Sequence, residues 1–494
     1  MVEAPVREND GLALRPYQVE AVRALRAAFA AGKRAPVYQL PTGGGKTVVF
    51  AHIAREGAKR GTRVLILVHR RELLLQGSRA LREVGLDHGL IAPTLPPSDA
   101  QVRIASVQTL VRRLDHVSPP DLVVIDEAHH AVAGSWRRVL EQWPRARVLG
   151  VTATPARLDG KGLGVHVDGP FDHLVLGPSV RALTEAGFLA PADVYAPPMK
   201  ADLSGVGTRL GDFDRREMRL RMDKPVISGD AVDHYLRLTP GRPAIAFCTS
   251  VEHAEHVAEA FTDADVPAAS IDGGMSDVER DGVLEDLARG EIQVLTSCEI
   301  VSEGFDLPAV EVAILLRPTQ SLTLYLQQVG RVLRPAPGKA SATVLDHVGN
   351  VKRHGLPDAD RSWDLDGAMR RSAGEAPVCR CPECFACHPP ARMCPVCGHV
   401  YGGEGREGLR VDPDAQLERV SRAPRDLWTP VRERMRQAHI EQGRCRTFEE
   451  LVDLGIRRGY GNPRAWARNV WRARHRSRRL GPSVPEAAAD EVSA

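Results

Sequence analysis

Residues 122–130 read LVVIDEAHH, an apolar run that ends in two adjacent carboxylates, Asp126 and Glu127. A short apolar run bounded by polar residues predicts a buried strand, and nearly continuous apolar strands are typical of parallel sheets covered by helices on both faces. At the end of such a strand Asp126 is placed to hold a Mg²⁺ ion, and Glu127 is placed to polarise a water molecule. The stretch therefore predicts an α/β fold with a reactive edge to its sheet.

A glycine-rich turn upstream complements these carboxylates. The sequence PTGGGKT, residues 41–47, lies between an expected strand, PVYQL, and an expected helix, TVVFAHIAREGAK. Glycines let backbone N–H groups approach phosphates at a helix N-terminus, Lys46 reaches the β- and γ-phosphates, and the Thr47 hydroxyl binds Mg²⁺. The full pattern expects a further glycine where Leu40 stands. The residues predicted to hold ATP and Mg²⁺ here are Thr42, Gly43, Gly44, Gly45, Lys46 and Thr47.

The alternation of short apolar runs with helical stretches extends beyond these two motifs. It continues to about residue 155, weakens over a segment rich in Gly, Pro and charge, and resumes with PAIAFC, IQVLTSC, EVAILLR and ATVLDHV. We therefore expect an α/β protein with two parallel-sheet domains. The predicted divisions are a first domain at 1–175, an irregular segment at 176–225, a second domain at 226–360, a cysteine-rich patch at 376–402 and a helical basic tail at 425–482.

With these motifs in this order, residues 12–350 resemble the superfamily 2 helicases and translocases, in particular the DEAH-type branch, with residues 126–129 as the box. The resemblance implies two tandem RecA-like domains with an ATP cleft between them. It implies that Gln18 of LRPYQ hydrogen-bonds the adenine base. It also implies that Thr152 and Thr154 of VTATP couple hydrolysis to nucleic-acid movement.

The second domain carries a motif that bears on the same chemistry. YLQQVGRVLRP, residues 325–335, places Arg331 and Arg334 three residues apart, so both lie on one face of a helix. Across an interdomain cleft they would neutralise charge on the γ-phosphate in the transition state, which matches the family's arginine finger, and Gln327 would position the nucleotide. CEIVSEGFDLP resembles the family's fifth motif and implies two further nucleotide contacts, Gly304 and Asp306.

Several loops of both domains resemble the strand-contacting motifs of the family. They are LVHRREL, ASVQT, FCTS and DGGMS. The residues implied to lie near the nucleic-acid backbone are Arg71, Gln108, Thr109, Ser250 and Gly274. ATP turnover would open and close the cleft between the domains, and each cycle would shift their grip along the strand.

Six of the nine cysteines fall within residues 379–397. Two knuckles, CPEC and CPVC, each place two thiolates on a tight turn, and together they supply the four tetrahedral ligands of a structural Zn²⁺ site. The predicted ligands are Cys381, Cys384, Cys394 and Cys397. Alternatives stay open: Cys387 could replace Cys384, His388 and His399 are further candidates, and a disulfide network would require an oxidising compartment. The pattern also resembles the zinc ribbon appended to phage-like and bacterial members of this helicase branch.

The C-terminal region is strongly basic. Residues 454–485 hold nine arginines and no Asp or Glu, although the whole chain has a net charge of only +3. Arginines at four-residue intervals form one stripe on a helix, and they are Arg464, Arg468, Arg472 and Arg476. A stripe undiluted by acidic residues favours a face that follows phosphates. The alternative is an amphipathic helix that packs its tryptophans on the body and leaves the arginines in solvent.

The expected setting comes from the N-terminus and from the lengths of the apolar runs. The N-terminus MVEAPVREND lacks the apolar core of a secretory signal, and no run reaches the ~18 apolar residues of a membrane span. We therefore expect a cytoplasmic protein with no membrane partner.

The leading hypothesis is an ATP-dependent DNA helicase or translocase that uses ATP, Mg²⁺ and Zn²⁺. DNA is favoured because the ribbon-bearing branch that the chain resembles is mainly associated with DNA. The alternatives are an RNA-remodelling helicase and an ATP-switched nucleic-acid-binding subunit of a larger complex. A protein partner, such as a nuclease or a repair or replication factor, remains open.

Overall fold

The computed structural model describes most of the chain up to residue 401 and a few residues after it. The described residues are 14–93, 95–96, 98–157, 161–196, 206–209, 212–298, 310–367, 378–401, 441, 445–457, 464, 467 and 471. The chain divides into two units, Met1–Gly402 and Gly403–Ala494. The first unit contains both predicted α/β domains.

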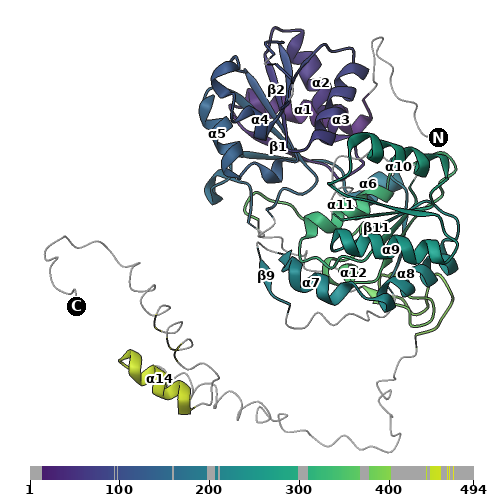
Figure 1. Cartoon of the computed structure of the whole chain (residues 1–494). Helices are drawn as coiled ribbons and strands as arrows, with labels where there is room; N and C mark the ends of the chain where they lie inside the picture. The colour runs from purple at the N-terminus through teal and green to yellow at the C-terminus, as the bar shows by residue number, and fades with distance from the viewer. Residues whose placement is uncertain are drawn as a thin grey trace, which may run out of the picture. The chain divides into compact units, whose positions relative to one another are not determined.

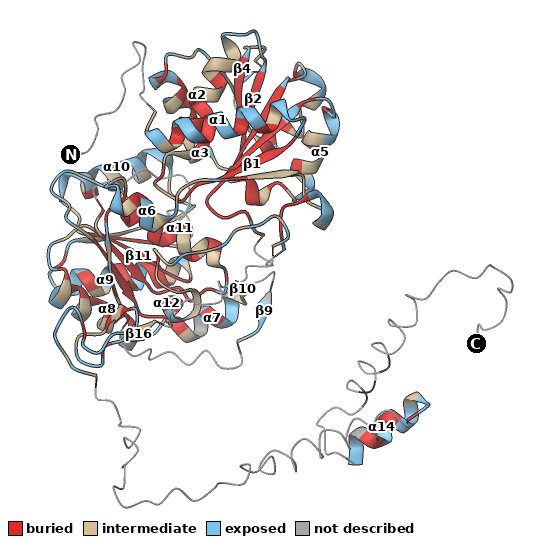
Figure 2. Ribbon diagram, turned by 180° about the vertical axis from the view of Figure 1, so that it is seen from behind, coloured by how far each residue is buried: buried red, intermediate tan, exposed pale blue. Residues whose placement is uncertain are grey.

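The first domain is built on a seven-stranded parallel sheet of order β3-β4-β2-β5-β6-β1-β7. Its central strands are almost wholly buried because their sequences are apolar on both faces (Figure 2). The strands are β1 (Pro36–Gln39), β2 (Val64–Val68), β3 (Gly89–Ile91), β4 (Val102–Ser106), β5 (Leu122–Asp126), β6 (Arg147–Thr152) and β7 (His173–Leu176). The order places β5 and β1, which precede the two nucleotide motifs, on either side of β6.

Helices cover both faces of this sheet (Figure 1). One face packs against α1 (Pro16–Ala30), α2 (Lys46–Ala58) and α3 (Arg71–Glu83). The other packs against α4 (Val107–Leu110) and α5 (Gly134–Gln142), with the short 3₁₀ helices η1 (Leu114–His116), η2 (Ala128–His130) and η3 (Val165–Val167) in the connections. The two faces have separate hydrophobic cores, as expected for a sheet buried on both sides.

The second domain has an eight-stranded sheet of order β12-β13-β11-β14-β15-β8-β17-β16. The strands are β8 (Ala192–Tyr195), β11 (Ala244–Phe247), β12 (Ala268–Ile271), β13 (Val294–Ser297), β14 (Val312–Leu315), β15 (Ala342–Asp346), β16 (Cys379–Arg380) and β17 (Ala386–His388). The strands from β12 to β8 pair in parallel, whereas β17 and β16 are antiparallel. The cysteine-rich hairpin therefore continues the sheet at its β8 edge.

The helices of the second domain are α6 (Val180–Glu185), α7 (Arg215–Met222), α8 (Pro225–Leu238), α9 (Val251–Asp263), α10 (Asp277–Arg289), α11 (Leu322–Val332) and α12 (Asn350–His354). Both α9 and α11 carry buried apolar faces against the sheet, and Ser250 and Ser321 cap their N-termini. The fold expected from the sequence, two parallel-sheet α/β domains, is therefore confirmed.

The segment at 176–225, expected to be irregular, needs correction. It contains α6, α7, a two-stranded hairpin of β9 (Thr208–Arg209) and β10 (Asp212–Phe213), and the strand β8. The sequence signal was weak because these elements are short and β8 finds its partner, β15, far along the chain. Non-local pairing of this kind leaves little trace in local sequence patterns.

After α12 the chain returns to the first domain as an extended stretch that we call the strap (residues 356–367). The Gly162 N–H donates to the Asp366 carbonyl (3.2 Å) and the Gly164 N–H donates to the Leu365 carbonyl (2.9 Å). The Leu365 side chain packs on the core beneath α4 and α5. Gly162 and Gly367 meet backbone to backbone where a side chain on either would collide. Within the described residues, the chain thus connects the two domains at two places, after β7 and at the strap.

Among the described residues of the second unit, α14 (Phe448–Arg457) packs Leu451 and Leu454 with Ala467. In the part of the chain that the structure describes, every helix is too short or too polar to cross a membrane.

Candidate active site

The phosphate loop after β1 adopts a backbone conformation that depends on its glycines. Gly43 and Gly45 have φ values of +85° and +87°, a left-handed conformation that residues with a Cβ rarely adopt. Leu40, which stands where the full motif has glycine, is completely buried beneath the loop. A Cβ on Gly44 would lie 2.7 Å from Leu40 Cγ, so the loop rests directly on this side chain. The Leu40 side chain, which replaces the glycine of the motif, therefore supports the loop from below.

Helix α2 begins at Lys46, so its N-terminus and the N–H groups of the loop face the same point. Lys46 Nζ donates to the Leu40 carbonyl (3.3 Å). Burial lowers the pKa of Lys46, and the carboxylates of Glu127 and Asp126 act in the opposite direction. Thr47 follows as the second residue of α2 and is half-buried. These groups together form a positively charged cradle of the kind that binds phosphate.

The acidic box lies at the carboxyl end of β5, beside this cradle. Asp126 ends the strand and accepts a hydrogen bond from the Glu127 N–H (3.0 Å), while Glu127 takes the left-handed conformation (φ 49°). His129, only 4% exposed, lies with Nδ1 3.5 Å from Glu127 Oε2 and 3.3 Å from Thr152 Oγ1. The Thr152 hydroxyl donates to the Thr154 carbonyl (3.0 Å). The box and the VTATP segment are therefore in direct contact.

Gln18 lies against the phosphate loop. Its side chain is 2% exposed, accepts from the Arg15 N–H (2.9 Å) and donates through Nε2 to the Gly44 carbonyl (3.3 Å). The Tyr17 hydroxyl donates to the same carbonyl (2.8 Å). The start of α1 thus holds the conformation of the loop, in addition to the base contact that the resemblance implies.

Helix α11 of the second domain reaches the phosphate loop. A Cβ on Gly330 would lie 2.5 Å from Thr42 Cβ, and a Cβ on Gly43 would lie 3.4 Å from Arg334 Cγ. Arg331 lies on α11 and is 8% exposed, whereas Arg334 follows two residues after the helix ends at Val332, so the two arginines do not share one helix face as expected. Both arginines contribute to lowering the Lys46 pKa. A glycine at 330 is what allows the helix and the loop to approach so closely.

The donor set fits a nucleoside triphosphate. It combines the loop N–H groups, one lysine, two arginines from the other domain and an acidic pair suited to Mg²⁺. Gln327 is 4% exposed, and its buried Nε2 atom has no hydrogen-bond partner among the described residues. The Gln327 amide could therefore donate a hydrogen bond to an oxygen atom of a bound nucleotide. The two predicted contacts Gly304 and Asp306 lie outside the described residues.

The comparisons with known proteins agree with this geometry. Residues 11–157 match the family described as type III restriction enzyme, res subunit, and residues 229–336 match the helicase conserved C-terminal domain. The chain belongs to the superfamily 2 helicases. It is an ATP-dependent helicase by family, and the nucleotide cleft described above lies between its two matched regions.

Individual relatives span parts of this helicase. A 51.5 kDa protein of a Lactococcus phage is 33% identical over 385 residues, covering 77% of this chain and 81% of the phage protein. The putative ATP-dependent helicase IRC3 of Saccharomyces cerevisiae is 30% identical over 68% of this chain, and the DNA 3'-5' helicase XPB of Kineococcus radiotolerans is 28% identical over 68%. The chain spans only 51% and 59% of those two proteins. A solved fragment of a putative HsdR subunit of a type I restriction enzyme from Vibrio vulnificus shares the fold (TM-score 0.55, 22% identity, 74% of this chain and 68% of that one).

Two of the loops expected to contact nucleic acid face each other across the domains of the helicase. Arg71, at the start of α3, forms an ion pair with Asp277 at the start of α10. Beside it, Arg280 Nη1 lies 3.0 Å from Glu72 Oε1. We call these two pairs the clasp.

The ASVQT loop joins the first of these loops within the first domain. Gln108 is exposed, and its Nε2 donates to the His69 carbonyl (3.0 Å). His69 lies two residues before Arg71, so a hydrogen bond from the Gln108 side chain to the His69 backbone connects the two predicted strand-contacting loops of this domain.

The other predicted contact residues have structural roles in the same loops. Thr109 is buried within α4. Ser250 caps α9, accepting from the His253 N–H (3.1 Å). The Gly274 N–H donates to Asp272 Oδ1 (2.5 Å), which shapes the turn before α10. These three residues help to shape the loops, and their contacts with a nucleic-acid strand stay a prediction.

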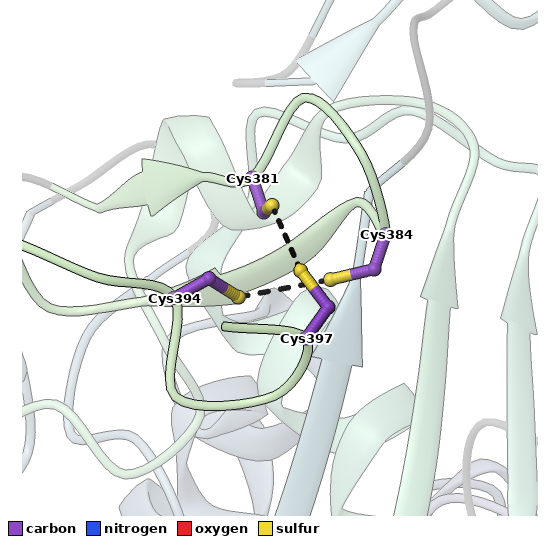
Figure 3. A group of neighbouring side chains, drawn as sticks. All are labelled: Cys381, Cys384, Cys394 and Cys397. Atoms are coloured by element: carbon purple, nitrogen blue, oxygen red, sulfur yellow. Dashed lines mark hydrogen bonds between the residues drawn. The ribbon is translucent and has the colours of Figure 1, made fainter. Parts of the chain in front are cut away.

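The four cysteines predicted to bind Zn²⁺ point toward one another (Figure 3). Their Sγ atoms all lie within 4.8 Å, with Cys381–Cys397 at 3.6 Å and Cys384–Cys394 at 3.7 Å. Tetrahedral thiolates at the usual Zn–S length of ~2.3 Å would stand ~3.8 Å apart, so the arrangement fits the ion. Burial opposes ionisation of the Cys394 thiol, but the backbone N–H groups of Cys397 and Val396 lower its pKa to about 6.

The alternative ligands lie elsewhere in the ribbon. Cys387 is on β17, in register with Val194 of β8, and burial raises its pKa to about 12. His388 Nε2 lies 2.6 Å from the Tyr401 hydroxyl, and His399 Nδ1 lies 4.0 Å from Glu383. The ribbon is thus held by four cysteines and attached to the second domain through its hairpin.

Of the predicted basic stripe, Arg464 is described and exposed. Arg468, Arg472 and Arg476 lie outside the described residues, so the stripe stays a prediction. Sequence reasoning noted Gly330 in YLQQVGRVLRP without giving it a role, and it did not single out the clasp residues Glu72, Asp277 and Arg280. A glycine inside an apolar helical run was the available signal for Gly330, whereas the clasp depends on two segments far apart in the sequence.

Proposed function

We propose that this helicase hydrolyses ATP with Mg²⁺ and uses the energy to move along or unwind DNA. The observation that carries the proposal is the contact of α11 with the phosphate loop, which brings Arg331 and Arg334 from one domain to Lys46 of the other. A cleft completed by both domains ties hydrolysis to their relative movement. A nucleotide-binding module without a motor function would not need it.

Each group then has a defined role. Lys46 and the loop N–H groups bind the β- and γ-phosphates, and Asp126 with Thr47 would hold Mg²⁺, which polarises the phosphates. Glu127 orients and activates the attacking water. Arg331 and Arg334 stabilise the charge that spreads over the γ-phosphoryl oxygens in the transition state.

The choice of DNA and of the cellular setting has separate support. A relative of this chain is named a DNA 3'-5' helicase, and the ribbon-bearing branch that the chain resembles is mainly associated with DNA. The four-cysteine cluster would hold Zn²⁺ as a structural ion, and thiolates of this kind persist in reducing compartments such as the cytoplasm. We further propose that a partner protein, such as a nuclease or a repair factor, works with the motor.

The test is the ATPase rate of zinc-replete protein without nucleic acid and with single-stranded DNA, duplex DNA, forked DNA or RNA. We expect strong stimulation by one form of DNA, and strand displacement on the matching substrate. Lys46→Ala and Glu127→Gln should abolish turnover, whereas Lys33→Ala, an exposed lysine of the same domain, should not. A rate indifferent to every nucleic acid would refute the motor function, and stimulation by RNA alone would change its substrate.

A further inference from the structure

Three histidine rings lie in contact between the acidic box and the nucleic-acid loops of the first domain. The ring centroids of His129 and His130 are 4.1 Å apart, and those of His130 and His69 are 4.3 Å apart. The rings are tilted, at 41° between His129 and His130 and 53° between His130 and His69, and we call these three residues the histidine stack. His129 is buried, and His130 and His69 are half-buried. His129 is the last residue of the acidic box and His69 lies in LVHRREL, but no contact with ATP or nucleic acid has been assigned to any of the three side chains.

One end of the stack lies at the reactive carboxylate. His129 Nδ1 is 3.5 Å from Glu127 Oε2 and 3.3 Å from the Thr152 hydroxyl. Glu127 follows directly on β5 in a left-handed backbone conformation, and the His129 ring is a direct neighbour of its carboxylate. The position of the His129 ring therefore bears on the position of the carboxylate that activates water.

The other end lies at the loops expected to grip nucleic acid. His69 follows β2 immediately and precedes Arg70 and Arg71 at the start of α3. Its carbonyl accepts a hydrogen bond from Gln108 Nε2 (3.0 Å), which comes from the ASVQT loop. Both loops of the first domain that the resemblance assigns to strand contact are thus connected to the backbone of His69.

Packed rings transmit displacement because protein interiors are dense and have low compressibility. A shift of the loop at His69 moves its ring against His130, and His130 moves against His129. The route is contiguous and lies within one domain, so it does not depend on closure of the cleft. It is a physical connection between the two sites, and coupling through such connections is of measurable size.

We propose that His69 and His130 are positioning residues that transmit nucleic-acid binding at the 69–71 and ASVQT loops to Glu127. In this arrangement the strand orders the loops, the stacked rings hold His129 in place, and Glu127 takes the direction that activates water. The inference rests on the proposed function, since it concerns how nucleic acid stimulates ATP hydrolysis. It adds a route through side chains that connects the acidic box to the strand-contacting loops.

The experiment compares ATPase rates of the full chain with and without the stimulating DNA in His69→Ala and His130→Ala. We expect the stimulation to fall about tenfold in both variants. In His130→Ala, which alters neither the box nor a strand-contacting loop, the unstimulated rate and the affinity for DNA should stay within about threefold. His69→Phe and His130→Phe, which retain a ring, should recover most of the stimulation. His88→Ala is the matched control, because His88 is a half-buried, hydrogen-bonded histidine of the same domain outside the stack.

The double variant His69→Ala/His130→Ala gives the sharpest test. Residues acting in series should lose no more stimulation together than either loses alone, whereas independent roles would multiply. Full stimulation in both alanine variants would overturn the inference, and so would an equal fall of stimulated and unstimulated rates. A wild-type rate that no nucleic acid raises would refute the proposed function itself, which is a distinct result from a stimulated wild type with unaffected variants.

Discussion

Gly330→Ala tests directly whether α11, the helix that carries Arg331, must touch the phosphate loop. The added Cβ would lie 2.5 Å from Thr42 Cβ, 2.8 Å from its Cγ2 and 3.1 Å from its Oγ1. Non-bonded carbons normally stand about 3.5–4.0 Å apart, so α11 must retreat by about 1 Å. Arg331 and Arg334 would retreat with it. Misplacement of reacting groups by about 1 Å can reduce a rate about 100-fold, and we expect a loss of that order in the stimulated kcat.

The assay separates this effect from damage to the fold. Alanine is favoured over glycine in a helix by up to about 1 kcal/mol, so the melting temperature of Gly330→Ala should be unchanged or higher. Binding of a fluorescent ATP analogue, which depends mainly on the first domain, should change little. Gly282→Ala in α10 is the control, because nothing lies within 4 Å of a Cβ at that position. Wild-type kcat in Gly330→Ala would refute the idea that contact between α11 and the loop is needed for hydrolysis.

Three further predictions concern the metal, the pH dependence and the clasp. Cys394→Ser should lose zinc and lower the melting temperature because β16 and β17 would leave the sheet edge, whereas Cys387→Ser should retain about one zinc per chain by elemental analysis, since its sulfur is outside the cluster. Burial lowers the pKa of His347 to about 3, compared with about 6.5 when unfolded, so the free energy of unfolding should fall as the pH drops from 6.5 toward 3. Between pH 6.5 and 5 this loss amounts to about 1.6 kcal/mol, and in urea titrations it should be absent from His347→Gln. Free energies of unfolding that fall in parallel for the two proteins would contradict this. Asp277→Asn should release Arg71 for phosphate and tighten DNA binding up to about fivefold at low salt, as measured by fluorescence anisotropy, and weaker binding would show that the clasp supports the bound state.

The sequence predicts the parts of this protein that are local. PTGGGKT and LVVIDEAHH specify their own turn, strand end and helix start, so the fold class and the elements that carry Lys46, Asp126 and Glu127 can be read from short stretches. The pairing of cysteines into two knuckles is equally local, because each knuckle closes within four residues.

The parts that depend on distant segments could not be read in this way. The strand β8 joins the second sheet beside β15, and β17 then adds to β8 in the opposite direction. Leu40 departs from the phosphate-loop pattern, yet its role beneath Gly44 appears only when the loop is folded over it. Gln18 lies in the element that the resemblance implies contacts adenine, and its side chain also donates a hydrogen bond to the Gly44 carbonyl. The local spacing of residues around Gln18 gives no indication of this hydrogen bond.

The strap has a mechanical consequence for the two domains. A body fastened to another at two separate points keeps one easy motion, a rotation about the line that joins the points. Here the points are the linker after β7 and the docking of Leu365 and Asp366 on Gly162 and Gly164. Sliding and twisting of one domain past the other are opposed by both tethers. The advance per ATP would then be set by lever length, the distance from that axis to the loops that grip the strand.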